Sequence, residues 1–260
     1  MKYERTWTGN WANAIHGLRH PLESYAKSDS KFGIASVDYF NDIRDDFINN
    51  VYAEEIKDPE KYKELFEFYD INSEIQYDPR YEEYEYALLG PKDLDLAQRM
   101  IKAGTPNDKF LRQIFVSVDI TAPLFWWKEA DTYKVATTAN STSTMHKLAS
   151  TPITIDCFEM DDFSSNIEFE YSINQVCDNI IDYCESLRQK YNETKDIRYW
   201  KELIRWLPES WLQTRTWTAD YSVLRNIYHW RKNHKLTEWH SFCGWIETLP
   251  YASKLLTFDN

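Results

Sequence analysis

Hydroxyl side chains crowd into one segment of the sequence, residues 122–148, between an apolar run and a histidine. They are Thr132, Thr137, Thr138, Ser141, Thr142, Ser143 and Thr144, and the histidine is His146. Hydroxyl and amide groups donate hydrogen bonds to phosphate and carbonyl oxygens, so the segment is interpreted as a ligand-binding loop. The alternative is a serine- and threonine-rich connection whose hydroxyl groups bond to their own backbone.

The composition bounds the class of protein. With 260 residues, of which 43% are hydrophobic, the chain can build one large domain or two small ones around a sizeable core. The formal net charge of -12 argues against binding to duplex nucleic acid or to an anionic membrane, because either needs a basic surface. We find no internal repeat and no linker that splits the chain, and we predict a single domain over residues 1–260.

Cysteine use and the lack of targeting signals predict a cytoplasmic protein. Cys157, Cys177, Cys184 and Cys243 have no CxxC spacing and are expected to be buried free thiols in a reducing compartment. No charged and apolar leader opens the sequence, and no apolar run approaches the roughly 20 residues that a membrane span needs. A glycine-rich phosphate loop is not expected, because the chain has six glycines and neither a GxGxxG nor a Walker pattern.

Hydrophobic periodicity predicts the elements that must position the site segment. Residues 1–30 are expected to form a short helix and then irregular chain. We expect strands over 32–39, 110–120 and 211–218, helices over 41–51, 94–103 and 173–187, a helix capped by Asp220 or Ser222, and a last helix that stops before Pro250. The helix over 173–187 is expected to be the clearest core helix, because its apolar residues share one face over four turns.

An acidic, tyrosine-rich stretch at about 54–92 interrupts this series. It is interpreted as a solvated helical insertion, because runs of charge are usually solvated faces. The alternative is a docking surface for a partner.

Arg231 is predicted to lie on the inward face of the helix after Asp220, at helical spacing with Leu224, Ile227 and Tyr228. An arginine on a buried face needs an anionic partner. That partner is either an acidic residue at the edge of the core or a bound ligand.

Two segments resemble the flavin-dependent thymidylate synthase family. In the first, a strand ending at Ala122-Pro123 precedes Thr138-x-Asn140-Ser141-x-Ser143-x-Met145-His146, which lies over the family's S-x-N-E-x-S-x-R-Y. In the second, the family has a Leu-Pro, a strand ending in Trp-Thr, a helix with an arginine in its last turn, a histidine and a Gln-Trp. This chain has Leu207-Pro208, Trp217-Thr218, Asn226, Arg231, His234 and Glu238-Trp239.

The resemblance implies an α+β fold with a central, mostly antiparallel sheet and flanking helices. Members of the family are tetramers with flavin and nucleotide sites at subunit junctions. The resemblance therefore implies a homotetramer, bound FAD and a pyrimidine nucleotide such as dUMP, with NADPH supplying hydride and methylenetetrahydrofolate supplying carbon.

The same resemblance implies roles for single residues. Arg231 matches the arginine that holds the nucleotide, and Ser143 matches the signature serine near the pyrimidine. Asn226 matches an asparagine that contacts flavin, Asp220 lies where the family has another, and His234 matches the histidine after the helix.

The chemistry implied is reductive transfer of one carbon, which puts negative charge on the pyrimidine carbonyls. Asn140, Ser141 and Ser143 are neutral donors that would stabilise this charge. Arg215 or Lys134 would hold the phosphate together with Arg231, and His146 or His234 would handle protons near neutral pH.

The sequence also departs from the family. The R-H-R triplet is absent, and Asp131-Thr132-Tyr133-Lys134 stands in its neighbourhood. Ser141 replaces the signature glutamate, and Met145 replaces the signature arginine. Arg215 falls one residue from the expected strand arginine, and a shift of one residue turns a side chain to the other face of a strand.

The residue patterns and the resemblance leave three hypotheses for the function. The first is a divergent flavoenzyme that modifies a pyrimidine deoxynucleotide. The second is a catalytically inactive nucleotide-binding or scaffold protein of the same fold. The third, a metal hydrolase using His229, His234 and His240, is disfavoured because their spacing does not put three ligands on one helical face, and no metal site is predicted.

Overall fold

The computed structural model describes residues 1–52, 84–160 and 173–259. The chain has an α+β fold with two sheets, one of four strands in the order β1-β4-β6-β5 and one that pairs β2 with β3. The strands of the larger sheet are β1 (Lys2–Gly9), β4 (Phe115–Pro123), β6 (Leu212–Asp220) and β5 (Thr138–Ser141). The α+β prediction is confirmed, whereas β1 was not expected from the sequence.

The chain divides into two compact units. The first unit comprises Met1–Lys2, Ile120–Lys134 and Ala139–Thr216, and the second comprises Tyr3–Asp119, Val135–Thr138 and Trp217–Asn260. Strands β4, β5 and β6 each run from one unit into the other. The prediction of a single domain therefore stays a prediction.

The helices of the second unit confirm most of the sequence pattern. They are α1 (Trp11–Arg19), α2 (Val37–Phe47), α4 (Pro91–Lys102), α9 (Tyr221–Arg231), α10 (Thr237–Glu247) and α11 (Ala252–Leu255). On α10 the predicted inward face is buried, with Trp239 and Phe242 each 1% exposed. Helix α4 ends just before Gly104, which has a φ of 69°, a conformation that glycine adopts without steric cost.

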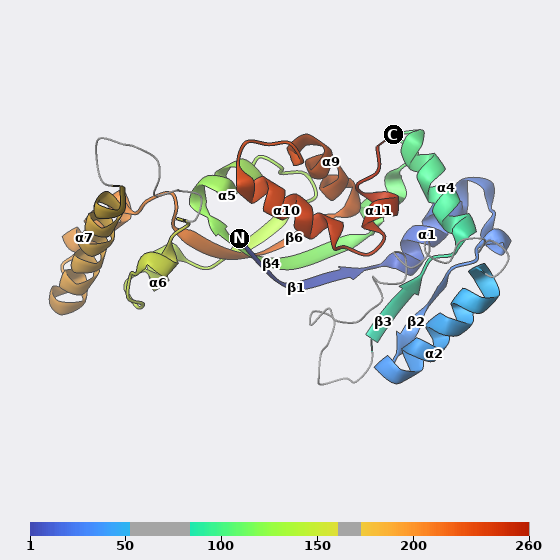
Figure 1. Ribbon diagram of the computed structural model, residues 1–260, viewed down its shortest axis with the longest axis horizontal. Helices are drawn as coiled ribbons and strands as arrows, with labels where there is room; N and C mark the ends of the chain where they lie inside the picture. Colours follow the sequence, from blue (N-terminus) through green and yellow to red (C-terminus); the bar gives the residue numbers. More distant parts are fainter. Residues whose placement is uncertain (53–83, 161–172, 260) are drawn as a thin grey trace. The chain divides into compact units, whose positions relative to one another are not determined.

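A small hairpin with its own core lies in the second unit. Strand β2 (Lys31–Ala35) pairs antiparallel with β3 (Tyr84–Leu88), and α2 lies beside them (Figure 1). The expected strand over 32–39 is shorter because the Ser36 side chain accepts a hydrogen bond from Tyr39 N and so begins α2. Phe40 and Phe47 of α2 pack against Leu88 of β3 in one buried cluster.

Strand β4 shows the predicted alternation in burial. Its inward residues Val116, Val118 and Ile120 are at most 1% exposed, whereas Phe115 is 47% exposed. The strand begins later than the expected residue 110, because Lys109–Gln113 form a 3-10 helix in which Phe110 and Leu111 are already buried. It also runs through Pro123, where it ends as predicted.

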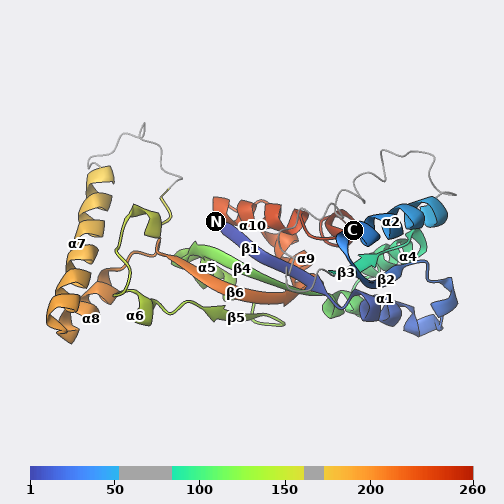
Figure 2. The ribbon, with the colours of Figure 1, turned by 90° about the horizontal axis from the view of Figure 1, so that it is seen from below.

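The helices of the first unit are α5 (Leu124–Ala130), α6 (Thr144–Lys147), α7 (Ile173–Thr194) and α8 (Ile197–Trp206). Helices α7 and α8 lie side by side (Figure 2) and share a core with Leu148, Ile153 and Phe158. The prediction that the whole apolar face of α7 is core is wrong. Cys184 and Leu187 are buried, but Val176 is 45% exposed and Ile180 is 38% exposed within this chain.

Several other expectations meet the structure only in part. The cysteines are all free, as predicted, but Cys157 and Cys177 are only half-buried.

Most of the acidic insertion predicted at about 54–92 lies outside the described residues, and its last part forms β3 and the start of α4. Within the described ranges, we find no helix with the length and apolar character of a membrane span.

Candidate functional site

The hydroxyl-rich segment is structured over much of its length. It contains α5, β5 and α6 and is therefore not one continuous loop. The hydroxyl of Thr132 donates to the carbonyl of Glu129 at 2.7 Å, as the backbone-satisfying interpretation expects. Past β5, Thr142 N donates to Thr214 O at 2.9 Å, which attaches the segment to β6. Asn140 and Ser141 are exposed on β5, so their side chains are accessible to a ligand.

Arg215 is the best-positioned cation of the first unit. Its guanidinium lies over the ring of Trp127, 4.2 Å from the ring centroid, and its Nε donates to Oε1 of Gln213 at 2.9 Å. Its Nη1 donates to Oδ1 of Asp131 at 2.8 Å. A guanidinium held by an aromatic face and an amide loses little conformational freedom when it binds an anion.

Local structure explains this geometry. Trp127 is 1% exposed, and its indole Nε1 donates to the carbonyl of Gln213 at 3.0 Å, which joins α5 to β6. The Gln213 side chain also donates to Thr142 O at 3.0 Å. Residues two apart on a strand share a face, so Arg215 lies beside Gln213. Arg215 therefore shares one face of β6 with Gln213 and lies over Trp127.

The Asp131 carboxylate, which pairs with Arg215, can be displaced by a ligand. The side chain of Asp131 is 54% exposed, whereas that of Arg215 is 15% exposed. An ion pair with one solvated partner contributes at most about 1 kcal/mol, so a ligand phosphate can displace the carboxylate. Asp131 lies where the family's R-H-R is expected, and no local pattern predicts its pairing with Arg215, 84 residues away.

The other predicted residues of the first unit are less constrained. Lys134 is exposed, and its backbone N donates to Thr132 O at 3.1 Å. Ser143 is half-buried, and its backbone carbonyl accepts from Lys147 N at 3.0 Å. His146 belongs to α6, but its side chain lies outside the described part of the structure.

In the second unit, Arg231 and His234 lie against the same aromatic ring. The Arg231 guanidinium is 4.5 Å from the ring centroid of Trp239, and the His234 ring is 6.2 Å from it. Nδ1 of His234 accepts from Leu236 N at 3.2 Å, so the proton of the neutral ring lies on Nε2. This pair combines a cation with an N–H donor, which suits the phosphate and carbonyl groups of a nucleotide.

Asp220 and Asn226 lie elsewhere on the same helix. Asp220 caps α9 by accepting from Val223 N at 2.8 Å, as predicted, and burial raises the pKa of its carboxyl. With a rise of about 1.5 Å per residue, the length of α9 separates Asp220 from Arg231. Asn226 is exposed in the middle of the helix. The structure thus brings Arg231 and His234 together, but not Asp220 with Arg231.

Sequence reasoning missed the most buried arginine of α9. Arg225 is 9% exposed, donates from Nη1 to Leu256 O at 2.9 Å and lies 4.4 Å from the ring centroid of Phe258. Burial lowers the pKa of its guanidinium. The helical pattern selected Arg231, which is only half-buried. The contacts of Arg225 come from the end of the chain, and periodicity does not predict them.

Glu238 is a buried acid that the sequence pattern did not single out as a site residue. It is 7% exposed in the first turn of α10, and its Oε2 has no hydrogen-bond partner among the described residues. A buried carboxylate oxygen without a partner is costly, and such atoms are often satisfied by a ligand. The family's glutamine at this position was the only available signal.

The histidines of the disfavoured metal hydrolase have other contacts in the structure. In residues 1–52, 84–160 and 173–259, no group of three His, Cys, Asp or Glu side chains could hold a metal ion. His240 instead lies 2.6 Å from His234 O through its Nε2, and His229 Nδ1 lies 3.5 Å from Asp259.

Comparison with known proteins places the fold. No family model and no curated protein matches the sequence. Two crystal structures of the flavin-dependent thymidylate synthase ThyX from Helicobacter pylori, each with FAD and dUMP, are similar to this chain. One has 14% identity and a TM-score of 0.56 and covers 98% of both chains. The other has 13% identity and a TM-score of 0.59 and covers 98% of this chain and 97% of that one. The chain therefore has a ThyX-like α+β fold.

Proposed function

We propose that this protein is a divergent flavin-dependent thymidylate synthase-like enzyme that transfers one carbon reductively to a pyrimidine deoxynucleotide such as dUMP. The observation that carries the proposal is the Arg215 cluster. An arginine held over Trp127 by Gln213, facing an exposed carboxylate, is a preorganised site for a phosphate. This chain and the two ThyX structures with FAD and dUMP share their fold over nearly the whole length of each chain.

The remaining residues of the first unit are assigned by their chemistry. Asn140 and Ser141 are exposed donors, and with Ser143 they would stabilise negative charge on the pyrimidine carbonyls. Lys134 is exposed and adds a second cation for the phosphate. Proton transfer near neutral pH would fall to His146 or to His234.

The residues of the second unit fit a flavin dinucleotide in part. Asn226 supplies an exposed amide, His234 supplies an N–H donor for phosphate groups, and Oε2 of Glu238 would accept from a ring N–H or a hydroxyl. Arg231 supplies a cation beside His234, for the phosphate of the substrate nucleotide, as the resemblance implies, or for that of the flavin. Asp220 is committed to its cap and could contribute only its second oxygen. FAD would supply the redox chemistry, with NADPH and methylenetetrahydrofolate as co-substrates.

The first test is the visible absorbance spectrum of the purified protein before and after incubation with FAD. The expected result is a flavin band that stays with the protein through gel filtration and weakens in Arg231→Gln and in Asn226→Ala. Lys232→Gln is the matched control, because Lys232 follows Arg231 and pairs with Asp259 at 3.0 Å. Gel filtration also tests the homotetramer that we propose. A protein that takes up no FAD is not a flavoenzyme.

The second candidate function is a catalytically inactive nucleotide-binding or scaffold protein in the cytoplasm. The observation that favours it is the pairing of Arg215 with Asp131, an acid where the family has arginines. This candidate predicts dUMP binding without FAD uptake. The flavoenzyme predicts both, so dUMP titration of the same sample separates the two.

A further inference from the structure

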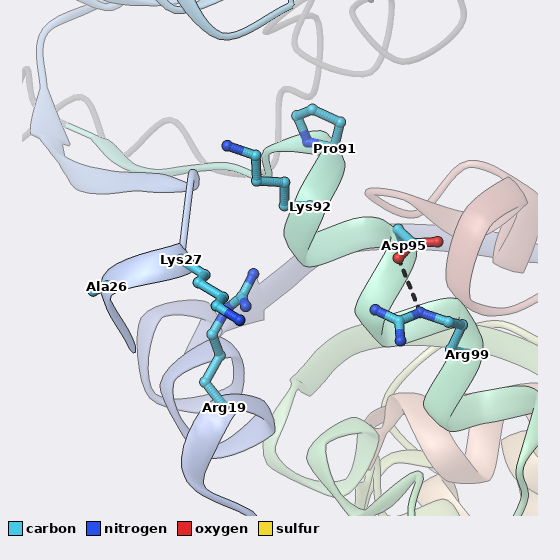
Figure 3. A pocket seen from close by; sticks show the side chains of 7 residues that line it. All are labelled: Arg19, Ala26, Lys27, Pro91, Lys92, Asp95 and Arg99. Carbon is cyan, nitrogen blue, oxygen red and sulfur yellow. Dashed lines mark hydrogen bonds and ion pairs between the residues drawn. The ribbon is translucent and has the colours of Figure 1, made fainter. Parts of the chain in front are cut away.

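Basic side chains line a pocket in the second unit that is unrelated to the residues discussed above. Its volume is ≈ 710 Å³. Its cations are Arg19 at the end of α1, Lys27 from the 3-10 turn Tyr25–Lys27, and Lys92 and Arg99 of α4 (Figure 3). Pockets of this size hold small organic molecules. The chain as a whole has a net charge of -12, so this concentration of positive charge is a local feature.

Arg19 is the buried cation of this pocket. Its side chain is only 5% exposed and points towards Lys27 (Figure 3), and its Nε donates to Oδ1 of Asp93 at 2.6 Å. Nη2 of Arg19 is buried and has no hydrogen-bond partner among the described residues. A buried N–H group without an acceptor is rare in folded proteins. Because Nη2 is closed to solvent, an anion in the pocket would supply that acceptor after a small movement of the Arg19 side chain towards it.

The nearby carboxylates are already committed to other donors. Oδ2 of Asp93 accepts from the hydroxyls of Ser28 and Ser30 at 2.7 and 2.6 Å. Asp29 accepts from Lys92 N and Asp93 N, at 2.9 and 3.2 Å, and so caps α4. Asp95, which lines the pocket, accepts from Nε of Arg99 at 2.9 Å (Figure 3). These acids hold the pocket's shape and leave it with more cations than carboxylates along its lining.

We propose that this pocket binds the phosphoryl group of a small phosphorylated molecule. Arginine side chains match the geometry of phosphate oxygens, and lysines add charge at any orientation. The lining has no aromatic ring, and its apolar part comes from Ala26 and Pro91. The pocket therefore recognises a polar ligand through its charge, and it is separate from the residues assigned to the proposed reaction.

The test is calorimetric titration of the full chain with inorganic pyrophosphate, in an Arg215→Gln background that removes the other phosphate-binding candidate. The expected result is saturable binding that weakens about tenfold in Lys27→Gln and in Arg99→Gln, since each removes a charge-assisted contact. Asp95→Asn is expected to tighten binding, because it removes the carboxylate from the lining. Lys102→Gln, an exposed cation of α4 outside the pocket, is expected to change nothing.

Three results would overturn the proposal. They are no binding of pyrophosphate, equal losses in Lys102→Gln and the pocket variants, and equal affinity for citrate, which would assign the pocket to polycarboxylates. Arg19→Gln is not needed, because loss of its buried pair with Asp93 is expected to unfold the region. FAD uptake is measured in parallel, so failure of this proposal is distinguished from failure of the proposed function.

Discussion

The ion pairs Arg19–Asp93 and Arg215–Asp131 have different surroundings. Arg19 and Asp93 are 5% and 0% exposed, and Asp93 also accepts from the backbone N of Asp29 and Ser30. Arg215 and Asp131 are 15% and 54% exposed. The Asp93 carboxylate is buried and accepts hydrogen bonds on both of its oxygens, so its role is structural. The Asp131 carboxylate is half exposed to solvent, so a ligand can replace it.

A third pair is intermediate between these two. Arg188 and Glu185 of α7 are 13% and 20% exposed, with two hydrogen bonds of 2.7 and 2.6 Å between them. The burial of the carboxylate therefore decreases from Asp93 through Glu185 to Asp131. The same order is expected for their contributions to stability, and the reverse order for their availability to an anion.

The largest effect is expected for Asp93→Asn. This change leaves the buried Arg19 guanidinium without its charge partner, which costs about 3–5 kcal/mol of unfolding free energy. Urea denaturation followed by tryptophan fluorescence measures it. Asp95→Asn is the control on the same helix, with a side chain that is 66% exposed, and is expected to change stability by less than about 0.5 kcal/mol. Equal losses in both variants would contradict the ranking.

A smaller effect that depends on pH is expected for Glu185→Gln. The Arg188 guanidinium lowers the pKa of Glu185 to about 2, and Ile153 N also donates to this carboxylate. A lowered pKa in the folded state stabilises the protein above the unfolded value of about 4.3, and this stability is lost as the pH falls through the folded pKa.

The variant is therefore expected to be about 2 kcal/mol less stable than the wild type at pH 7. The difference should shrink as the pH falls from about 4.3 towards 2. Urea denaturation at several pH values measures it. Glu193→Gln serves as control, because Glu193 pairs with Lys190 on the same helix and is 59% exposed. A difference that does not change with pH would show that the pair is not the cause.

The smallest effect on stability, together with a gain in binding, is expected for Asp131→Asn. Loss of this half-exposed pair should cost less than about 1 kcal/mol, while dUMP should bind more tightly because Arg215 no longer has a competing carboxylate. Glu209→Gln is the matched control, because Glu209 is also 54% exposed and pairs with a cation of α5, Lys128. Weaker dUMP binding in Asp131→Asn would mean that Asp131 orients Arg215 instead of competing for it.

Regular elements of this fold were predictable from local patterns. The alternation of β4 and the apolar face of α10 were read from the sequence because each buries one side of a regular element. The apolar face of α7 was read correctly as helical, but its burial was not, because periodicity does not say what covers a face. Strand β1 was missed because its burial pattern shows no regular alternation.

The contacts that make the sites were not predictable in the same way. Arg19 meets Asp93 across 74 residues, and Arg215 meets Asp131 across 84. Such pairs are set by the tertiary fold, and no spacing rule connects them. The resemblance to a family indicated Arg215 as a candidate, but not Trp127 and Gln213, which hold it.

The most direct test of the central claim is calorimetric titration of dUMP into the FAD-incubated protein and its Arg215→Gln variant. The expected result is saturable binding to the wild type and at least about tenfold weaker binding to the variant, since a charge-assisted contact to phosphate is worth about 1.5–3 kcal/mol. No binding, or equal binding to both proteins, would contradict the assignment of Arg215 as the residue that holds the nucleotide phosphate.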